Sequence, residues 1–587
     1  MNGDKLSQYK RKSNNLFASS TFATLVEKIR GGDRLTKLSG LNESSKQYLA
    51  TSLSIKLNRP ILYVVDTIEK AIEAQGNLSF FSVETPPVLF RKEQRLKDAI
   101  FSSVSKQGFD RINWLYNAGA KPLLISDLQA LFEFLIPKKV FEDSVLRVES
   151  GGSYSREHLI SKLVEIGYDP VEFVQKEGEY SRRGSIVDLF SPGEPHPIRL
   201  EFSGDEINSM RYFGITDQKS IRKIEKATIL PASEIILNDK TIRQSTSYIR
   251  KKAIEKEIPA KTKHSLIDEV SKAKRFPDID CLLPSFYPKL STVFDYLPED
   301  TLIVFDCAED TLKSFDSIMS SFFHSTNNLE RNLRLIPEAD ELYLTIDQYQ
   351  KEVSRFQRLV VEDVEIKEEG IESLRFLTEK IQIRGREESL STLISKTISA
   401  FDQLGYAVLL VFSNEDEKNK FNKLTDNNLI QSCGSEIGDI SSGFVFHEAK
   451  LALISERDLL GERKRLKSYP VRDIPSAFIT SFGELKTGDY IVHRECGIGI
   501  YRGLKKMTFG EMGGDFIICE YQGGDKIYVP IDKIKLVQRY IGDRKNPKIN
   551  KLGQQNWNSV LKRVGKAVEN IAKELIEVYA RRRTEKG

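Results

Sequence analysis

Residues 485–542 constrain the fold of this chain more than any other stretch, because short β-type runs alternate there with closely spaced glycines. Residues 490–492 and 516–521 are apolar or aromatic runs typical of strands. Gly523 and Gly524 favour a hairpin turn, since adjacent glycines adopt positive φ at little cost. Several short strands with such close turns predict a small β-barrel. Such a barrel is either purely structural or binds a partner through an exposed strand edge.

The length of 587 residues exceeds what one hydrophobic core supports, so we expect several domains. The net charge of +4 is small for this length and does not by itself indicate a nucleic-acid-binding protein. The sequence has no apolar run long enough to span a membrane, and its polar start does not resemble a signal peptide. We therefore expect a cytoplasmic protein without a membrane partner.

The 5 cysteines form no Cys-x-x-Cys pair, and together with the 6 histidines they show no zinc-ligand spacing. This pattern predicts reduced thiols and no metal site.

Residues 18–137 follow a mobile tail over 1–17 and alternate between strand and helix patterns, as in a parallel α/β sheet. Residues 226–345 return to the same texture and are expected to complete this first domain. The expected strands are 60–66, 87–90, 122–126, 280–286, 294–298 and 301–306.

Residues 40–47 have the register of a phosphate-binding loop, Gly-x-x-x-x-Gly-Lys-Ser/Thr. Gly40 and Lys46 are kept, but Ser45 replaces the second glycine and Gln47 replaces the hydroxyl that holds magnesium. The loop needs both groups to wrap the phosphates and bind the metal. We therefore predict a nucleotide fold that has lost its ATP site, and we assign no catalytic residue.

Residues 138–225 contain short strands and a helix over 155–167, which predicts an α+β insert within the first domain. Residues 346–455 predict a second small α/β domain around the apolar strand 407–412. A basic linker over 456–478 is more typical of a solvated connector than of a DNA contact. The barrel is assigned to residues 479–545.

The sequence from Asp543 to Gly587 is strongly basic, with 12 lysines and arginines and 5 acidic residues. We assign residues 546–587 as a last segment, a helix expected to lead to further domains. Apolar residues at three- and four-residue spacing predict a long amphipathic helix over 557–580. The predicted fold class is thus multidomain α/β and α+β: a degenerate P-loop-like parallel α/β domain with an α+β insert, a second small α/β domain, a small Tudor-like β-barrel and a C-terminal long helix.

Four strings of the predicted barrel are distinctive: Gly488-Asp489-Tyr490-Ile491-Val492-His493, Gly497-Ile498-Gly499, Tyr528-Val529-Pro530 and Arg539-Tyr540-Ile541-Gly542. They resemble the RNA-polymerase-interacting domain of the bacterial transcription-repair coupling factor family, which is related to the CarD family. The strings 182–190 and 199–207 resemble the module that the family shares with excinuclease B.

This resemblance implies two sets of contact residues. Arg183, Arg199 and Phe202 are expected to bind excinuclease A, although Ser203 stands where the family often has an aromatic residue. Without the resemblance, both arginines would be assigned as solvated strand residues paired with Asp188 or Glu201. A strand edge near Tyr501, Lys505, Lys506 and Met507 is expected to bind the β subunit of RNA polymerase.

The resemblance covers nearly the whole chain but only the N-terminal half of the family's protein. It implies a fragment that binds stalled RNA polymerase and recruits nucleotide excision repair. ATP, magnesium and most contacts with double-stranded DNA are then expected only in helicase-like motor domains that this sequence lacks. Two alternatives stay open, a CarD-like regulator of RNA polymerase without a repair role and an excinuclease-B-like damage-binding enzyme.

Overall fold

The computed structural model describes residues 16–539 and Ile549, except residues 43, 83–86, 91–105, 121–122, 216–217, 273–275, 277–278, 307–310, 331–334, 363–372, 382–389, 425–432, 461–487, 494–496, 510–511 and 531–536. The chain divides into two compact units, Met1–Leu466 and Lys467–Gly587. The predicted tail up to residue 15, the linker beyond residue 460 and the helix over 557–580 lie outside the described residues.

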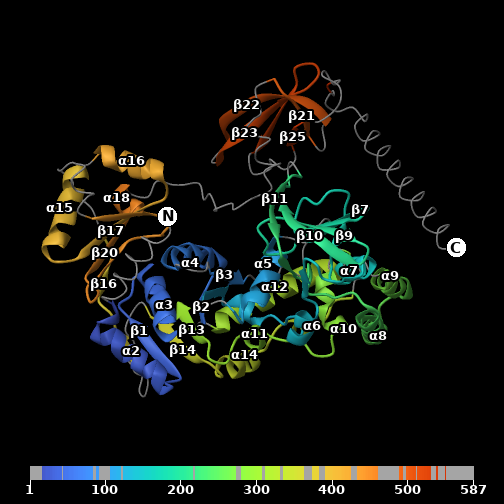
Figure 1. The fold of residues 1–587 in the computed structure, drawn as a ribbon, viewed down its shortest axis with the longest axis horizontal. Coiled ribbons are helices and arrows are strands. Elements are labelled where there is room, and N and C mark those ends of the chain that lie inside the picture. Colours follow the sequence, from blue (N-terminus) through green and yellow to red (C-terminus); the bar gives the residue numbers. More distant parts are fainter. Residues whose placement is uncertain are drawn as a thin grey trace. The chain divides into compact units, whose positions relative to one another are not determined.

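A seven-stranded parallel sheet forms the centre of the first unit (Figure 1). The chain builds it in the spatial order β15-β1-β14-β13-β2-β4-β3. Its strands are β1 (Leu35–Ser39), β2 (Ile61–Val65), β3 (Val88–Phe90), β4 (Leu123–Asp127), β13 (Leu302–Asp306), β14 (Gln357–Val361) and β15 (Ser373–Arg375). All five residues of β2 are buried, as expected for a strand with helices on both faces.

Two predicted strands of this sheet are helical instead. Residues 280–286 form η2 (Ile279–Leu282) and α10 (Leu283–Phe286), and residues 294–298 lie mostly in α11 (Val293–Tyr296). Pro284 occupies the first turn of α10, where its missing N–H costs nothing, and Thr292 forms a capping box with Asp295 at the start of α11. The prediction of strands here was wrong, because short apolar runs alone do not distinguish a strand from a helix, and Pro284 and Thr292 favour the start of a helix.

The boundary predicted at residue 346 also needs correction. Strands β14 and β15 belong to the large sheet, where β14 pairs with both β1 and β13. Strand β1 was not predicted, although it directly precedes the degenerate phosphate loop. The large sheet therefore draws on both predicted domains.

A second sheet of five strands follows in the same unit, in the order β16-β19-β20-β17-β18. Its strands are β16 (Thr378–Glu379), β17 (Ala407–Phe412), β18 (Gly434–Ile437), β19 (Phe444–Phe446) and β20 (Leu451–Ser455). One face packs on α15 (Leu390–Gln403), α16 (Glu415–Leu424) and α18 (Glu456–Leu460).

Helices α3 (Ser44–Leu57) and α4 (Ile68–Phe81) lie between the two sheets. Tyr48 of α3 contacts Phe444 of the second sheet, with ring centroids 5.6 Å apart, and shares a core with Tyr63 of β2. α2 (Ser20–Gly31) joins the same core. The two sheets thus share one apolar interior.

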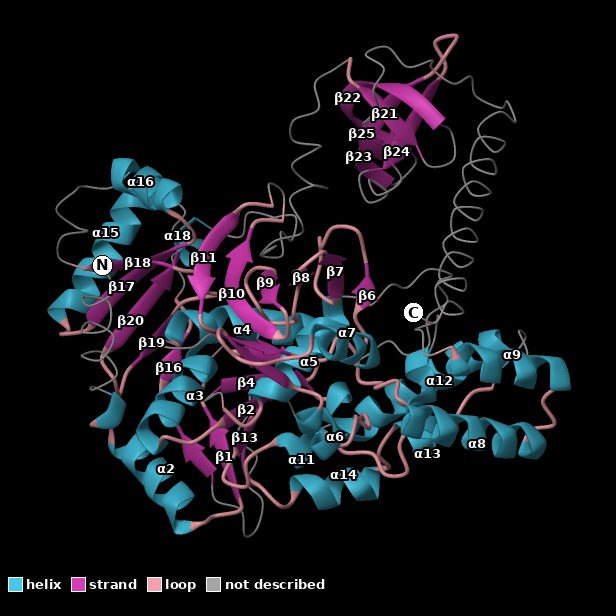
Figure 2. Cartoon of the chain, turned by 45° about the vertical axis from the view of Figure 1, so that its right-hand side comes forward, coloured by secondary structure: helices cyan, strands magenta, loops and turns pink. Residues whose placement is uncertain are grey.

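The insert forms a separate six-stranded sheet in the order β11-β10-β9-β8-β7-β6 (Figure 2). Its strands are β6 (Asp169–Pro170), β7 (Glu179–Arg183), β8 (Ile186–Leu189), β9 (Ile198–Ser203), β10 (Glu206–Phe213) and β11 (Ser220–Ile224). Strands β5 (Leu146–Glu149) and β12 (Lys226–Ile229) pair with each other beside it. One face of the sheet shares a hydrophobic core with α7 (Arg156–Glu165) and the large sheet.

The remaining helices of the first unit cover the other face of the large sheet and support the insert. They are α5 (Lys106–Asn117), η1 (Gln129–Phe132), α6 (Lys138–Asp143), α8 (Asp239–Glu255), α9 (Ala260–Ser271), α12 (Thr311–Glu330), α13 (Ala339–Leu342) and α14 (Ile346–Val353).

The second unit contains a five-stranded antiparallel sheet in the order β24-β23-β22-β21-β25. Its strands are β21 (Tyr490–His493), β22 (Gly497–Phe509), β23 (Met512–Glu520), β24 (Lys526–Pro530) and β25 (Val537–Arg539). The predicted β content of this region is confirmed, whereas a closed Tudor-like barrel stays a prediction.

Among the described residues, no helix is long and apolar enough to cross a membrane. The described part of the chain also contains no cluster of three metal-ligating side chains. Cys281, Cys433 and Cys519 are buried cysteines that form no disulfide.

Candidate functional site

The insert presents a charged outer face, which we call the arginine face and define as Arg183, Asp188, Arg199, Glu201 and Arg211. Strand pairing sets Asp188 opposite Arg199, and Arg199 opposite Arg211. Directly paired residues share one face of a sheet, and residues two apart along a strand share it too. The opposite face carries the apolar residues of the core.

Asp188 binds two arginines of the arginine face, Arg183 and Arg199, through its carboxylate. Its carboxylate is 1% exposed, and its Oδ1 accepts a hydrogen bond from Nε of Arg199 at 2.7 Å. Its Oδ2 accepts from Nη2 of Arg199 at 2.9 Å and from Nη2 of Arg183 at 2.6 Å. The hydrogen bond to Asp188 raises the pKa of Arg199 above its usual value. Both guanidinium groups are therefore held in fixed positions by one buried carboxylate.

The two arginines differ in accessibility. The side chain of Arg199 is 14% exposed, whereas that of Arg183 is 40% exposed. The pairing with Asp188 matches the alternative that the sequence left open for these arginines. Of these two arginines, Arg183 has the side chain that is more accessible to a partner.

Phe202 does not belong to this face. Phe202 is 5% exposed and lies in the core. It follows Glu201 directly along β9, and neighbouring side chains of a strand lie on opposite faces of the sheet. This corrects the prediction for Phe202, and Ser203 takes the exposed outer position next to it.

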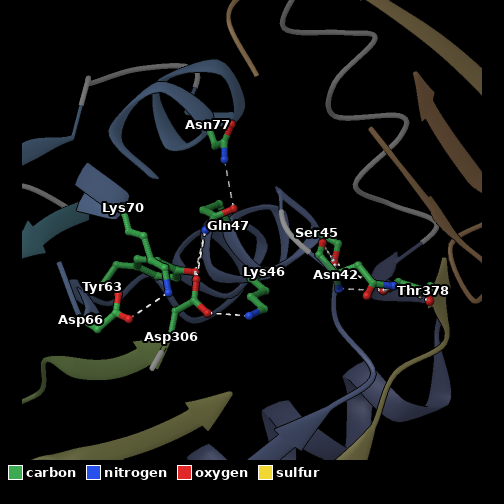
Figure 3. A network of polar contacts seen from close by, with 10 residues as sticks. All are labelled: Asn42, Ser45, Lys46, Gln47, Tyr63, Asp66, Lys70, Asn77, Asp306 and Thr378. Atoms are coloured by element: carbon green, nitrogen blue, oxygen red, sulfur yellow. Dashed lines mark hydrogen bonds and ion pairs between the residues drawn. The ribbon is translucent and has the colours of Figure 1, made fainter. Parts of the chain in front are cut away.

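The degenerate phosphate loop has the strand–loop–helix setting of an intact one, since it joins β1 to α3. Figure 3 shows that its lysine points to an acid of the same chain: Nζ of Lys46 lies 2.7 Å from Oδ1 of Asp306. The other oxygen of Asp306 accepts from the hydroxyl of Tyr63 at 2.6 Å and from Nε2 of Gln47 at 3.3 Å. The groups that would face phosphate and metal thus satisfy one another.

Polar groups of this loop also form hydrogen bonds with other residues of the same chain. The backbone N–H of Asn42 donates to Oγ1 of Thr378 at 3.0 Å, and Nδ2 of Asn42 donates to the Thr378 carbonyl at 2.8 Å. Ser45, which replaces the second glycine, donates from Oγ to the Asn42 carbonyl at 2.6 Å. A backbone amide that would cradle a phosphate is therefore committed within the protein.

The loop region is also tied to the second sheet through Asn77 of α4. Oδ1 of Asn77 accepts from the Ser441 N–H at 2.8 Å, and its Nδ2 donates to Oγ of Ser441 at 3.0 Å and to Oε1 of Gln47 at 3.3 Å. Sequence reasoning missed Asn77, Thr378 and Ser441, because each acts through a partner far away in the chain.

The predicted polymerase contacts lie on or beside β22 in the second unit. Tyr501 is 8% exposed and belongs to the small core of this sheet, so its ring is not a surface contact. Burial raises the pKa of its hydroxyl. Beyond a bulge after Tyr501, the backbone of Lys505, Lys506 and Met507 pairs with β23, whereas the pairing of β22 with β21 is confined to Gly497–Ile500. The prediction of a strand edge therefore rests on this extended hairpin.

Comparison with known proteins assigns a class to two of these regions. Residues 146–235 match the family model "UvrB interaction domain", and residues 485–541 match "CarD-like/TRCF RID domain". The first range contains the arginine face, and the second contains the whole five-stranded sheet.

Curated relatives named transcription-repair-coupling factor match most of the chain. The protein of Myxococcus xanthus is 28% identical over 96% of this chain, and that of Bacillus subtilis is 25% identical over 97%. The Haemophilus influenzae protein is 26% identical over 80%. The chain covers 50%, 50% and 42% of these relatives respectively, so it spans about half the length of the curated relatives it matches. The resemblance inferred from the sequence strings is thereby confirmed.

Proposed function

We propose that this chain is the partner-binding half of a transcription-coupled DNA repair factor. The arginine face recruits excinuclease A, and the hairpin of β22 and β23 binds the β subunit of RNA polymerase. The observation that carries the proposal is the presence of both domain classes in one chain whose relatives are named transcription-repair-coupling factors.

The chemistry of Arg183 supports the first contact. Its side chain is 40% exposed and its guanidinium is oriented by Asp188, so little side-chain entropy is lost when a partner carboxylate binds. Arginine forms bidentate hydrogen bonds with carboxylates, which makes an acidic surface the matching partner chemistry.

The degenerate phosphate loop supports a binding role rather than an ATP-dependent one for this half. Its Lys46 is paired with Asp306, and the backbone N–H of its Asn42 donates to the hydroxyl of Thr378. ATP hydrolysis, magnesium binding and translocation on double-stranded DNA belong, in this proposal, to motor domains of the longer relatives.

The test is a binding experiment with purified cognate RNA polymerase and excinuclease A. We expect the unmodified chain to bind both. Arg183→Glu should weaken excinuclease A binding by more than tenfold without affecting polymerase, because it places a carboxylate against an acidic partner. Met507→Arg should abolish polymerase binding without affecting excinuclease A.

Matched controls separate surface effects from folding. Arg182 is 45% exposed but points to the opposite side of β7, where it pairs with Glu157 of α7 at 2.8 Å. Arg182→Glu should therefore retain excinuclease A. Gln522→Arg, in the exposed turn between β23 and β24, is the control for Met507→Arg.

Two results would redirect the proposal. Polymerase binding without excinuclease A binding would favour the CarD-like regulator. Binding to damaged DNA without either protein would favour an excinuclease-B-like role.

A further inference from the structure

Phe173 is a large apolar residue that the insert leaves 45% exposed beside the arginine face. It lies in the segment between β6 and β7, and its neighbour Val174 is 1% exposed in a small cluster with Phe190 and Phe213. A single exposed apolar residue is ordinary on a protein surface. The surroundings of Phe173 distinguish it.

The backbone on both sides of Phe173 is fastened to β7. The Val171 N–H donates to the Tyr180 carbonyl at 2.8 Å, and Oγ of Ser181 donates to the Glu172 carbonyl at 2.7 Å. On the other side, the N–H groups of Gln175 and Lys176 donate to Oε2 of Glu179 at 2.9 and 3.0 Å. These bonds therefore hold the backbone on either side of Phe173 in place.

The ring of Phe173 lies against the guanidinium of Arg183, whose side chain is the most exposed of the three arginines of the arginine face. Cζ of Arg183 is 5.0 Å from the centroid of Phe173, within the range of a cation–π contact. Arg183 is thus fixed by an aromatic ring and by the Asp188 carboxylate. Arg199 has the same arrangement in buried form, since its Cζ lies 4.5 Å from the centroid of Phe213.

We infer that Phe173 is a further contact residue of the arginine face and forms the apolar centre of this docking surface together with Arg183. Aromatic residues and arginine are enriched among the residues that carry most of the binding energy at protein interfaces. An aromatic ring buries a large area with few rotatable bonds, and the contacts of Arg183 with Asp188 and Phe173 already restrict its longer side chain. The surface fits a partner that combines an apolar depression with a neighbouring carboxylate. This inference rests on the proposed function, and the partner it commits to is excinuclease A.

The test measures the dissociation constant of purified excinuclease A for the full chain by calorimetry or interferometry. Phe173→Ala should weaken binding about tenfold or more, and Phe173→Tyr should restore most of it, because the ring and its contact with Arg183 remain. Ile254→Ala is the matched control, since Ile254 on α8 is 77% exposed and far from the face in sequence. The control should bind like the unmodified chain.

A double-mutant cycle adds a readout that a loss of stability would not produce. Phe173→Ala and Arg183→Ala together should weaken binding by less than the product of their separate effects, because each residue supports the same contact. Thermal unfolding of each variant checks that the insert stays folded.

The outcomes separate the inference from the function on which it rests. If the unmodified chain does not bind excinuclease A, the proposed function itself fails. If the chain binds, Arg183→Glu abolishes binding and Phe173→Ala matches the unmodified chain, the docking surface is real but Phe173 is not part of it. Equal losses for Phe173→Ala and Ile254→Ala would also overturn the inference.

Discussion

The ammonium nitrogen of Lys46 lies 2.7 Å from a carboxylate oxygen of Asp306, and both side chains are 13% exposed. In a working phosphate loop the lysine would face phosphate and the acid would face a metal. Here the two groups neutralise each other, with Tyr63 bound to the second carboxylate oxygen at 2.6 Å. The two residues that would bind phosphate and metal thus form a structural ion pair between α3 and β13.

We predict that Lys46→Met destabilises the first unit and changes no nucleotide-dependent property. The substitution leaves the Asp306 carboxylate partly buried without its cation, which costs about 1.5–3 kcal/mol. Chemical denaturation measures the loss, and titration with a fluorescent ATP analogue should show no binding before or after it. Lys70→Met is the control, because its ion pair with Asp66 is 59% and 42% exposed and contributes at most about 1 kcal/mol. ATP hydrolysis by the unmodified chain that Lys46→Met abolishes would contradict this account.

Gly40 gives a second prediction, because this loop glycine closely approaches the backbone of Phe376, directly after β15. Its φ is +75°, and a Cβ there would stand 2.1 Å from the Phe376 carbonyl oxygen. Gly32, at the C-cap of α2, has φ +90° with nothing within 4 Å of a Cβ. Both alanine variants incur the left-handed backbone cost, but Gly40→Ala should lose about 1–3 kcal/mol more through the collision. Equal unfolding midpoints for the two variants would show that the Phe376 segment yields freely.

Much of the fold could be predicted because its strands carry strong local signals. The runs 60–66 and 407–412 are almost wholly apolar, and both became buried parallel strands. Strand β1 was missed because its sequence LTKLS is half polar, yet its residues from Thr36 to Ser39 are buried. Strands of a parallel sheet are buried because helices cover both faces of the sheet, so the polar residues of β1 did not indicate its burial.

Candidate site residues could be proposed from the sequence only where they lie in a string that resembles one of the family. Arg183 and Arg199 were identified through such strings, and the alternation of β9 then removed Phe202 from the surface. The partners of the degenerate loop had no local signal, since Asn42 and Thr378 are separated by 336 positions. Contacts of that kind depend on how two sheets pack, which no spacing in the sequence encodes.

Asn77 provides a test of this packing between the sheets. The residue is 2% exposed and satisfies the N–H and the hydroxyl of Ser441, so Asn77→Ala leaves partly buried polar groups without this partner. We expect a loss of about 1–3 kcal/mol and faster amide hydrogen exchange in α4 and β19, measured by mass spectrometry. Ser79→Ala, on the exposed side of the same helix, should change stability by less than about 0.5 kcal/mol. Unchanged exchange in β19 would show that the sheets are held by their apolar core alone.

Arg111 of α5 leads to the last prediction, which concerns how the insert is attached to the large sheet. Its side chain is 1% exposed and forms ion pairs with Glu133, which is 0% exposed, and with Glu234, which is 12% exposed. Glu234 follows the insert in sequence, and its second oxygen accepts from the Ile136 N–H at 3.2 Å. The Arg111 guanidinium also lies 4.7 Å from the Phe90 ring centroid of β3. Arg111→Met should cost about 3–5 kcal/mol, because two carboxylates lose their buried cation.

The consequence of Arg111→Met for binding separates attachment from recognition. The arginine face makes no use of Arg111, so the fraction of protein that stays folded should keep the unmodified affinity for excinuclease A, while the unfolding midpoint falls. Lys139→Met is the control, because its pair with Asp143 is 86% and 67% exposed and its loss should be nearly neutral. A variant that stays fully folded but no longer binds excinuclease A would mean that the attachment of the insert sets the geometry of the arginine face as well as its stability.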